Sequence, residues 1–336
     1  MDRVAGALGQ GGPGAHRPCD DGEESAGIVN AASDEHVGHV PVLLADVLQR
    51  VEPTTGQTIL DATLGRGGHA RAMGERLGTD GHLIGIDLDA ETLATTARML
   101  DALACRVSLR QASFADLDAV LADVGVETVD GILADLGFAS SQMDDPQRGF
   151  SFQRDGPLDM RYDRSGDETA AELVNRLPET DLADLIFFNS QERHSRRIAK
   201  AVCRARRDRR IVTTGRLAQI VASAVPTNPA GRSGRLHPAT RTFQALRIAV
   251  NREMENLDAL LASAPRCLAT GGRIAVISFH SLEDRRVKED FRRRAASGHY
   301  TLITRKPVTA SGDETRANPR ARSAKLRVAR RTDLPI

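Results

Sequence analysis

Short strand-like runs alternate with helical segments in the first half of the chain, and this alternation constrains the fold more than any other feature. The runs cover residues 58–62, 83–86, 106–110 and 129–134. Strands that are joined through helices pair in parallel, with the helices packed on the faces of the sheet. The pattern therefore predicts an α/β fold built on a parallel sheet.

The alternation stops after about residue 143. The following segment, 144–236, is polar and rich in Arg, and its apolar residues recur at helical spacing. The α/β pattern then returns, with a strand expected over 273–277. We therefore expect one α/β domain over 37–143 and 237–336, split by an inserted helical, Arg-rich domain over 144–236.

Residues 1–36 differ from the rest in composition. They hold seven acidic residues against two Arg, and they show no apolar periodicity. A segment of this kind cannot bury a core, so we expect a disordered tail. It also lacks the basic region and apolar stretch of a secretory signal. No apolar run approaches the roughly 18 residues of a membrane span, so we expect a cytoplasmic protein with no membrane partner.

Two residue types exclude further classes of site. The four cysteines lie far apart and form no CxxC pair, so neither a disulfide framework nor a metal site is expected. Aromatic residues make up only 3% of the chain, and Trp is absent. A binding surface built on many stacked rings is therefore excluded, and recognition must depend on charge and shape.

A Gly-rich turn, residues 65–69, joins the first strand to a helix. Glycines allow close approach of a ligand to the backbone, and a helix N-terminus favours an anion. The spacing G-x-G-G does not fit the dinucleotide fingerprint G-x-G-x-x-G. A tight turn without a ligand is the alternative on this segment alone.

Further polar and aromatic residues follow the other strands. Asp87 ends the second strand about twenty residues after the turn, where an acidic residue can bind ribose hydroxyls; it could also cap the next helix. Asp135 ends the fourth strand, where it could bind a ligand or cap a turn. Phe114 follows the third strand and could pack on a flat ring or in the core. Together with the Gly-rich turn, these strand ends indicate a binding site at one edge of the sheet.

Six segments, in order along the chain, resemble the MraW/RsmH methyltransferase family. They are GRGGH (65–69), RGFSF (148–152), DGPLDMR (155–161), HPATRTFQ (237–244), SFHSLEDR (278–285) and NPRARS (318–323). The resemblance runs from about residue 39 to residue 331. It implies a Rossmann-like class I methyltransferase sheet with an inserted helical domain, and that the inserted domain, expected over 144–236, recognises the substrate.

The resemblance also implies a reaction and a cofactor. The family uses S-adenosylmethionine to methylate N4 of cytosine 1402 in the 16S rRNA of the small ribosomal subunit. The cofactor contacts that it implies in this chain are Gly67, Gly68, His69, Asp87, Phe114, Asp135 and Gln142. One departure is that the family's Leu-Gly-Val-Ser-Ser-Pro-Gln reads Leu-Gly-Phe-Ala-Ser-Ser-Gln at 136–142, which removes a proline.

Methyl transfer to cytosine N4 needs a hydrogen-bond acceptor. The N4 lone pair is conjugated with the ring, so an acceptor near the N4 hydrogens would help the amine to pyramidalise and later take a proton. Asp135 is the first candidate, for this role or for holding the methionine end of the cofactor. His280 and Asp284 are further candidate catalytic residues, and for His280 a structural role is an equal alternative.

Two clusters of basic residues indicate a surface for RNA. Residues 193–210 hold nine basic residues and one acid, and residues 316–331 hold seven and none, although the whole chain carries a net charge of only +1. Solvated helix faces are the alternative, but two clusters with so few acids favour contact with RNA phosphates. The residues that we assign to this surface are Arg204, Arg206, Arg207, Arg320 and Arg322.

Two other classes of function remain open on the sequence. A nicotinamide-dependent oxidoreductase would use the same sheet and Asp87, but it should show G-x-G-x-x-G at the first turn. A non-catalytic RNA-binding ribosome assembly factor would keep the basic clusters and would need no cofactor pocket.

Overall fold

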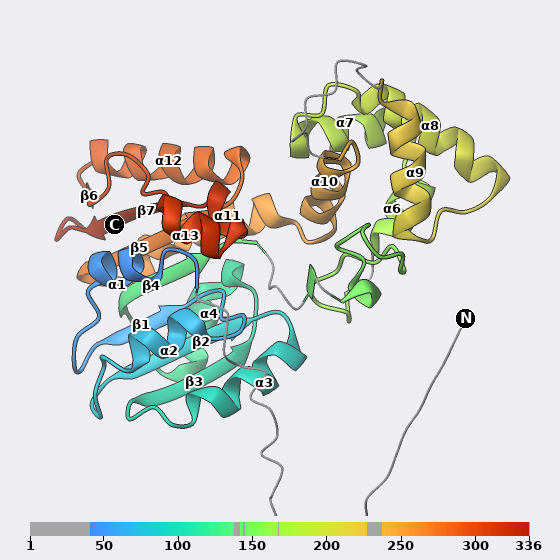
Figure 1. Cartoon of the computed structure of the whole chain (residues 1–336). Coiled ribbons are helices and arrows are strands. Elements are labelled where there is room, and N and C mark those ends of the chain that lie inside the picture. Colours follow the sequence, from blue (N-terminus) through green and yellow to red (C-terminus); the bar gives the residue numbers. More distant parts are fainter. Residues whose placement is uncertain (1–40, 138–141, 144, 167, 227–236, 336) are drawn as a thin grey trace, which may run out of the picture. The chain divides into compact units, whose positions relative to one another are not determined.

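A seven-stranded sheet forms the centre of the α/β part of the molecule (Figure 1). The computed structural model describes residues 41–137, 142–143, 145–166, 168–226 and 237–335. The strands lie in the order β3-β2-β1-β4-β5-β7-β6. Their bounds are β1 Thr58–Asp61, β2 His82–Asp87, β3 Arg106–Gln111, β4 Val129–Asp135, β5 Leu268–Ser278, β6 Tyr300–Leu302 and β7 Lys325–Arg331.

Strands β1 to β5 run parallel, whereas β7 is antiparallel to both β5 and β6. The expected parallel α/β sheet is confirmed, and the strand predicted over 273–277 lies inside β5. The two last strands, β6 and β7, were not predicted.

Successive residues of each central strand pack on opposite faces of the sheet. Ile59 and Leu83 face one layer of helices, and Leu60 and Ile84 face the other. The helices of the first layer are α1 Leu44–Val51, α2 Gly68–Gly74 and α3 Ala90–Leu100. Those of the second are α4 Leu117–Val124, α11 Glu253–Cys267 and α12 Ser281–Ala296. Both faces of the sheet are therefore buried, as expected for strands that read as nearly continuous apolar runs.

A group of helices with its own core lies in the chain between β4 and β5. These helices are α6 Ala170–Arg176, α7 Glu179–Ser190, α8 Ser195–Asp208, α9 Thr214–Ala224 and α10 Thr240–Val250. Their core includes Leu182, Ile198, Leu217 and Phe243. The predicted helical insertion in the α/β fold is therefore confirmed. We call α6 to α10, together with the loop from 145 to 169, the helical part.

The predicted limits of the domains remain predictions. Helix α10 packs on the same core as α7 although it begins after residue 236, where we expected the insertion to end. The expected tail, residues 1–36, lies outside the described residues. Within the described residues the structure also has helix α13 Gly312–Ala317 and three short 3-10 turns: η1 Phe114–Asp116, η2 Pro146–Arg148 and η3 Pro319–Ser323. None of the helices described has both the length and the apolar character needed to traverse a bilayer.

Candidate functional site

The site lies where the strand order changes direction. From β1 the chain passes to β2 on one side, and later to β4 on the other side of β1. In parallel sheets such a switch point opens a crevice at the carboxyl ends of the strands. Here Thr63, just after β1, accepts a hydrogen bond through its Oγ1 from the backbone N–H of Asp135 at 2.6 Å. The end of β4 is thus fixed beside the turn that follows β1.

Two glycines of that turn have no room for a side chain. Gly67 has a φ of 72°, and a Cβ atom there would lie 2.5 Å from Cγ2 of Thr96. A Cβ atom at Gly68 would lie 2.4 Å from Cγ of Pro41. Any larger residue would move the turn away from α3 or from Pro41. The glycines therefore place the first turn of α2 at the crevice.

His69 and Asp135 face each other across the crevice. Nε2 of His69 lies 3.6 Å from Oδ2 of Asp135, which is beyond a hydrogen bond but within reach of an ion pair. Among the described residues, neither ring nitrogen of His69 has a hydrogen-bond partner, nor has Oδ1 of Asp135, although all three atoms are shielded from solvent. Buried polar atoms are normally satisfied. This pair therefore fits a polar ligand that supplies the missing partners.

The charges around His69 favour its protonated form. Burial lowers the pKa of the imidazole, but the carboxylates of Asp135 and Asp61 outweigh that effect, so the net shift of the pKa is upward. A positively charged group at this position would attract an anionic part of a ligand.

Asp61, at the end of β1, is the most buried carboxyl group of the crevice. Its residue is only 1% exposed, and Oδ1 accepts a hydrogen bond from the N–H of Thr63 at 3.1 Å. Burial raises the pKa of Asp61 from 3.8 to about 6, although His69 and the N–H of Thr63 act in the opposite direction. The sequence analysis did not assign Asp61, yet its position after the first strand is the signal used for Asp87 and Asp135.

We expect Asp61→Asn to stabilise the protein more at high pH than at low pH. Because the pKa of Asp61 is raised in the folded protein, its contribution to the free energy of unfolding is fully present below about pH 3.8. This contribution is lost as the pH rises through about 6. Asparagine has no such titration. Urea unfolding at about pH 5 and about pH 8 measures the difference between the variant and the original protein. A difference that stays constant or shrinks with rising pH would contradict the prediction.

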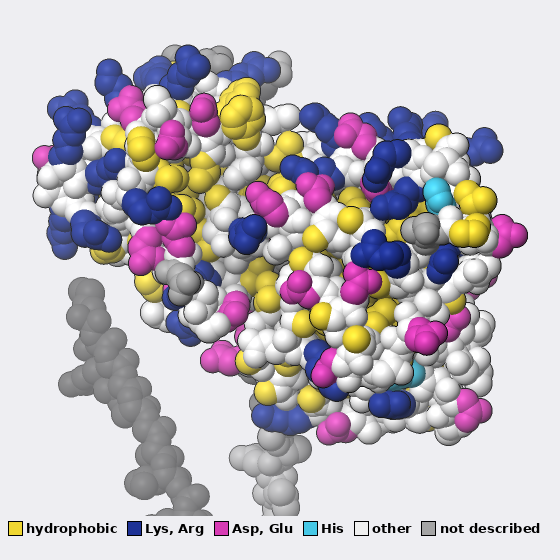
Figure 2. Space-filling view, turned by 180° about the vertical axis from the view of Figure 1, so that it is seen from behind, with side chains coloured by type: hydrophobic (Ala, Val, Ile, Leu, Met, Phe, Trp, Pro, Cys, Tyr) yellow, Lys and Arg dark blue, Asp and Glu magenta, His cyan; other side chains and the backbone are white. Residues whose placement is uncertain are grey.

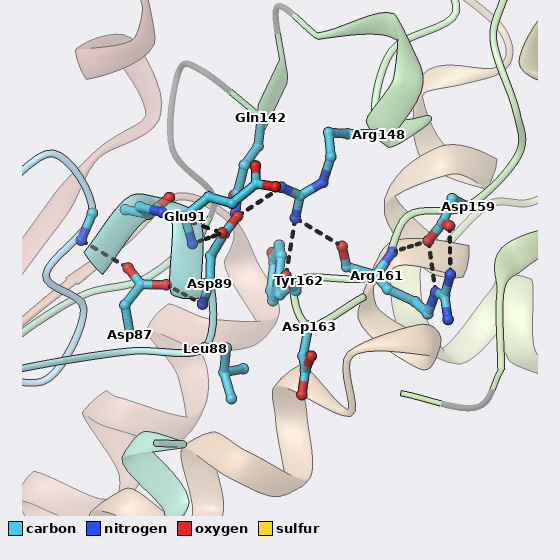
Figure 3. Close-up of polar contacts among 12 residues, drawn as sticks. Asp87, Leu88, Asp89, Glu91, Gln142, Arg148, Asp159, Arg161, Tyr162 and Asp163 are labelled. Carbon is cyan, nitrogen blue, oxygen red and sulfur yellow. Dashed lines mark hydrogen bonds and ion pairs between the residues drawn. The ribbon is translucent and has the colours of Figure 1, made fainter. Parts of the chain in front are cut away.

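Asp87, at the end of β2, holds the loops on both sides of the crevice. Oδ2 accepts from the N–H of Gly65 at 2.8 Å and Oδ1 from the N–H of Asp89 at 2.9 Å (Figure 3). Burial raises the pKa of Asp87, and these two N–H groups oppose that rise. Each carboxylate oxygen can accept a second hydrogen bond, so the group can still bind hydroxyls of a ligand. Phe114, after β3, is half-buried and packs on the sheet core.

Asp89 connects this edge of the sheet to the helical part. It caps α3, and its Oδ2 accepts from Arg148 at 2.6 Å and from Gln142 at 3.1 Å (Figure 3). Arg148 also donates to the carbonyl oxygens of Arg161 and Tyr162. Burial alone would raise the pKa of Asp89, but the hydrogen bonds from Arg148 and Gln142 outweigh burial, so the net shift of the pKa is downward. Gln142, a predicted cofactor contact, therefore binds Asp89, whose backbone N–H in turn donates to Asp87.

The other two predicted catalytic residues lie at the start of α12. His280 is paired with Glu283, and its Nε2 lies 3.1 Å from Oε1 of that residue. Asp284 is instead paired with β7, where Arg327 donates to it at 2.7 Å and Lys325 at 3.3 Å. Neither is among the partners of His69, Asp135 or Asp87 described above.

A group of possible metal ligands lies next to His280. Side-chain atoms of Glu253, His280 and Glu283 come within 4.8 Å of one another. Both oxygens of Glu253, however, accept hydrogen bonds from the buried guanidinium of Arg247, at 2.7 and 2.9 Å. The guanidinium of Arg247 already neutralises Glu253, so the close approach of these three side chains needs no metal ion.

Comparison with known proteins decides the family. Residues 36–332 match the model of the MraW methylase family. The chain belongs to the MraW methylase family. The expectation of S-adenosylmethionine as its cofactor, drawn from the resemblance, is confirmed by this membership.

Curated relatives of this MraW family member match almost all of its length. Ribosomal RNA small subunit methyltransferase H of Koribacter versatilis is 47% identical over 319 residues, which cover 93% of this chain and 99% of the relative. The protein of the same name from Sorangium cellulosum is 50% identical over 293 residues, covering 87% and 90%. A solved structure, an rRNA methylase from Streptococcus thermophilus, shows 9% identity and a TM-score of 0.37, over 84% of this chain and 92% of that chain.

The basic residues assigned from the sequence fall into two kinds in this methylase. Arg204 and Arg207 on α8 are exposed, as are Arg320 and Arg322 on η3, whereas Arg206 is partly buried and donates to the carbonyl oxygen of Val174. Figure 2 shows Lys and Arg side chains gathered over the helical part, at the upper left of that view. The cluster at 316–331 is partly structural, because Arg327 lies on β7 and is buried.

Proposed function

We propose that this methylase transfers the methyl group of S-adenosylmethionine to N4 of cytosine 1402 in the 16S rRNA of the small ribosomal subunit. The observation that carries the proposal is the unsatisfied pair of His69 and Asp135 at the switch point, next to Asp87. The names of the relatives support an rRNA substrate. Such an enzyme would act in the cytoplasm, where ribosomal subunits are assembled.

The cofactor would be held by the residues at the ends of the first four strands. Asp87 would accept hydrogen bonds from ribose hydroxyls, and Gly67 and Gly68 would allow close approach of the backbone. His69, Phe114 and Gln142 complete the proposed set, with Gln142 acting beside Asp89. When bound, S-adenosylmethionine supplies a methyl group activated by a positively charged sulfonium.

The part of this chain in the reaction is to orient the amine and accept its proton. Asp135 would accept a hydrogen bond from the N4 amine, which favours the pyramidal geometry needed for attack and gives the proton an acceptor. Its Oδ1 has no competing partner among the described residues. Asp135 could instead hold the methionine end of the cofactor. His280 and Asp284 remain proposed catalytic residues of second rank, because the structure gives both a local ion-pair partner.

The RNA would be held through its phosphates. The target base must leave any stacked helix, or come from a single-stranded loop, before it can reach the methyl group. Arg204 and Arg207 on α8, and Arg320 and Arg322 on η3, offer exposed cations for this contact, with Arg206 beside them. Mass mapping of rRNA, after assembled small subunits are incubated with the enzyme and labelled cofactor, tests the reaction and the modified position together.

We expect Asp87→Ala to weaken binding of S-adenosylmethionine by about tenfold to a hundredfold. The reason is the loss of a hydrogen bond from a ribose hydroxyl to a charged acceptor, which contributes about 1.5–3 kcal/mol. Isothermal titration calorimetry measures the change. Asp123→Ala is the matched control, since that carboxylate is exposed and pairs with Arg110 away from the crevice. Equal affinities of the two variants would refute the ribose assignment.

The two alternative functions predict other results. An oxidoreductase would bind a nicotinamide cofactor, and an assembly factor would bind the subunit but neither cofactor. Membership of a methylase family already favours methyl transfer over both. Calorimetry that detected no binding of S-adenosylmethionine would remove the proposed reaction.

A further inference from the structure

A polar pocket with a volume of about 300 Å³ lies at the start of α12. Its walls come from the α7–α8 connection, from α10 and from the turn after β5, and they include Arg193, Arg241, Gln244 and His280. This volume is at the lower end of the range for small-molecule sites. The segments HPATRTFQ and SFHSLEDR, whose resemblance to the family was noted above, both contribute to this pocket. Apart from His280, the proposed function gives the lining residues no role.

The chemistry of the walls is that of an anion site. Among the residues that the structure describes, no Asp or Glu lines the pocket, whereas two guanidinium groups do. Among the described residues, the side chains of Arg193, Gln191 and Gln244 have no hydrogen-bond or ion-pair partner. Arg241 is 53% exposed at its side chain and has Glu192 as a neighbour at 3.8 Å, too far for a strong hydrogen bond. Several donors therefore converge on the same space with few acceptors to satisfy them.

The identity of the anion follows from what the pocket lacks. A cytosine ring would need a flat apolar or aromatic wall, and within the described part of the chain Leu282 is the one apolar side chain that lines the pocket. A phosphodiester group needs guanidinium, amide and hydroxyl donors, which these walls provide.

We propose that this pocket holds one backbone phosphate of the RNA next to the target nucleotide, clamped between Arg193 and Arg241. The inference rests on the proposed rRNA substrate. Its position supports it: the pocket begins at His280, just beyond the end of β5, and β5 pairs with β4 so that Ile277 lies opposite Asp135. The phosphate would thus be gripped one strand away from the carboxylate that receives the amine.

Salt dependence of RNA binding tests the number of phosphates involved. The probe is a single-stranded oligoribonucleotide that carries the target cytosine, bound to the full chain. We expect the double variant Arg193→Gln/Arg241→Gln to bind about tenfold more weakly or worse. The slope of log affinity against log salt is negative, and we expect its magnitude to decrease by about 0.7 in this variant. That is the value for one phosphate on a single strand, and two phosphates would give twice that decrease. The double variant Arg193→Lys/Arg241→Lys keeps the charges and should keep the slope.

The matched control is Arg266→Gln. Arg266 is an exposed arginine in the last turn of α11, and it pairs with Asp118 of α4. The slope and the RNA affinity of this control should stay those of the original protein. Binding of S-adenosylmethionine, measured by calorimetry, should be the same in all variants. Equal slopes for the glutamine double variant and the control would overturn the proposal.

A second experiment uses the original protein and neutralises the RNA instead. Uncharged methylphosphonate linkages are placed in turn at each position around the target cytosine. We expect one linkage beside the target to weaken binding about tenfold, and the same linkage to have no effect on the glutamine double variant. If no linkage behaves in this way, the clamp does not exist. A protein that binds cofactor and this RNA but transfers no methyl group would refute the proposed reaction and leave the clamp standing.

Discussion

Asp135→Ala is expected to lower the rate of methyl transfer by about 10²- to 10⁴-fold, the range of a lost general base or acceptor. The carboxylate ends β4 at the switch point, and its backbone N–H is held by Thr63. Oδ1 is shielded from solvent and has no partner among the described residues, so its removal costs no local hydrogen bond. Transfer of labelled methyl groups to assembled small subunits is the measurement.

The control lies on the same strand. Asp130, near the start of β4, accepts a hydrogen bond from the N–H of Thr58 at 2.8 Å. Asp130→Ala should cost some stability and leave transfer unaffected, because Asp130 lies at the amino end of the sheet. Transfer by Asp135→Ala at the rate of the original protein would refute the assignment. Parallel calorimetry separates its two possible roles, since a loss of cofactor affinity equal to the loss of rate identifies a cofactor contact.

Arg148→Met is expected to destabilise the protein by about 3–5 kcal/mol, the usual cost of removing one partner of a buried ion pair. Arg148 and Asp89 are each about 7% exposed at the side chain, so Asp89 would be left as a buried charge. The carbonyl oxygens of Arg161 and Tyr162 would lose donors as well. Unfolding in urea measures the loss of stability.

Two further variants sharpen this result. Arg148→Met combined with Asp89→Asn should recover part of the loss, because asparagine carries no charge and can still cap α3. Arg71→Met removes an exposed partner of Glu75 and should cost about 0–1 kcal/mol. A cost for Arg148→Met no larger than that for Arg71→Met would show that the buried pair has no special weight in stability.

Local pattern was sufficient to predict the first five strands and insufficient for the last two. In β1, β2, β4 and β5 an apolar run follows or precedes a helical segment, and in β3 Val107 and Leu109 alternate with polar residues. In β7, by contrast, basic residues interrupt the buried positions Leu326, Val328 and Ala329. The same basic residues were interpreted as an RNA surface. Arg327 instead points to Asp284, a contact between segments 43 residues apart that no local pattern reveals.

The candidate site, like the sheet, was predicted only in part from the sequence. The rule that ligands bind at the carboxyl ends of strands is enough to select Asp87 and Asp135 from the sequence. The link between Asp89 and Arg148 spans 59 residues and depends on how the loop after β4 folds back. The RGFSF segment, which contains Arg148, was noted only for its resemblance to the family and gave no indication of this partner. Tertiary contacts, and not composition, bring Asp89 and Arg148 together.

The position of the helical part between β4 and β5 also has a consequence for folding kinetics. These strands are neighbours in the sheet, yet residues 136–267 separate them along the chain. Closing so long a loop costs entropy before the pairing returns any energy. Helices α7, α8 and α9 pack on one another in chain order. Contacts between consecutive helices form quickly, and their early formation would bring the ends of the loop closer together. The half-sheet β3-β2-β1-β4 can thus assemble from consecutive segments, while β5 and the strands beyond it must wait for the helices.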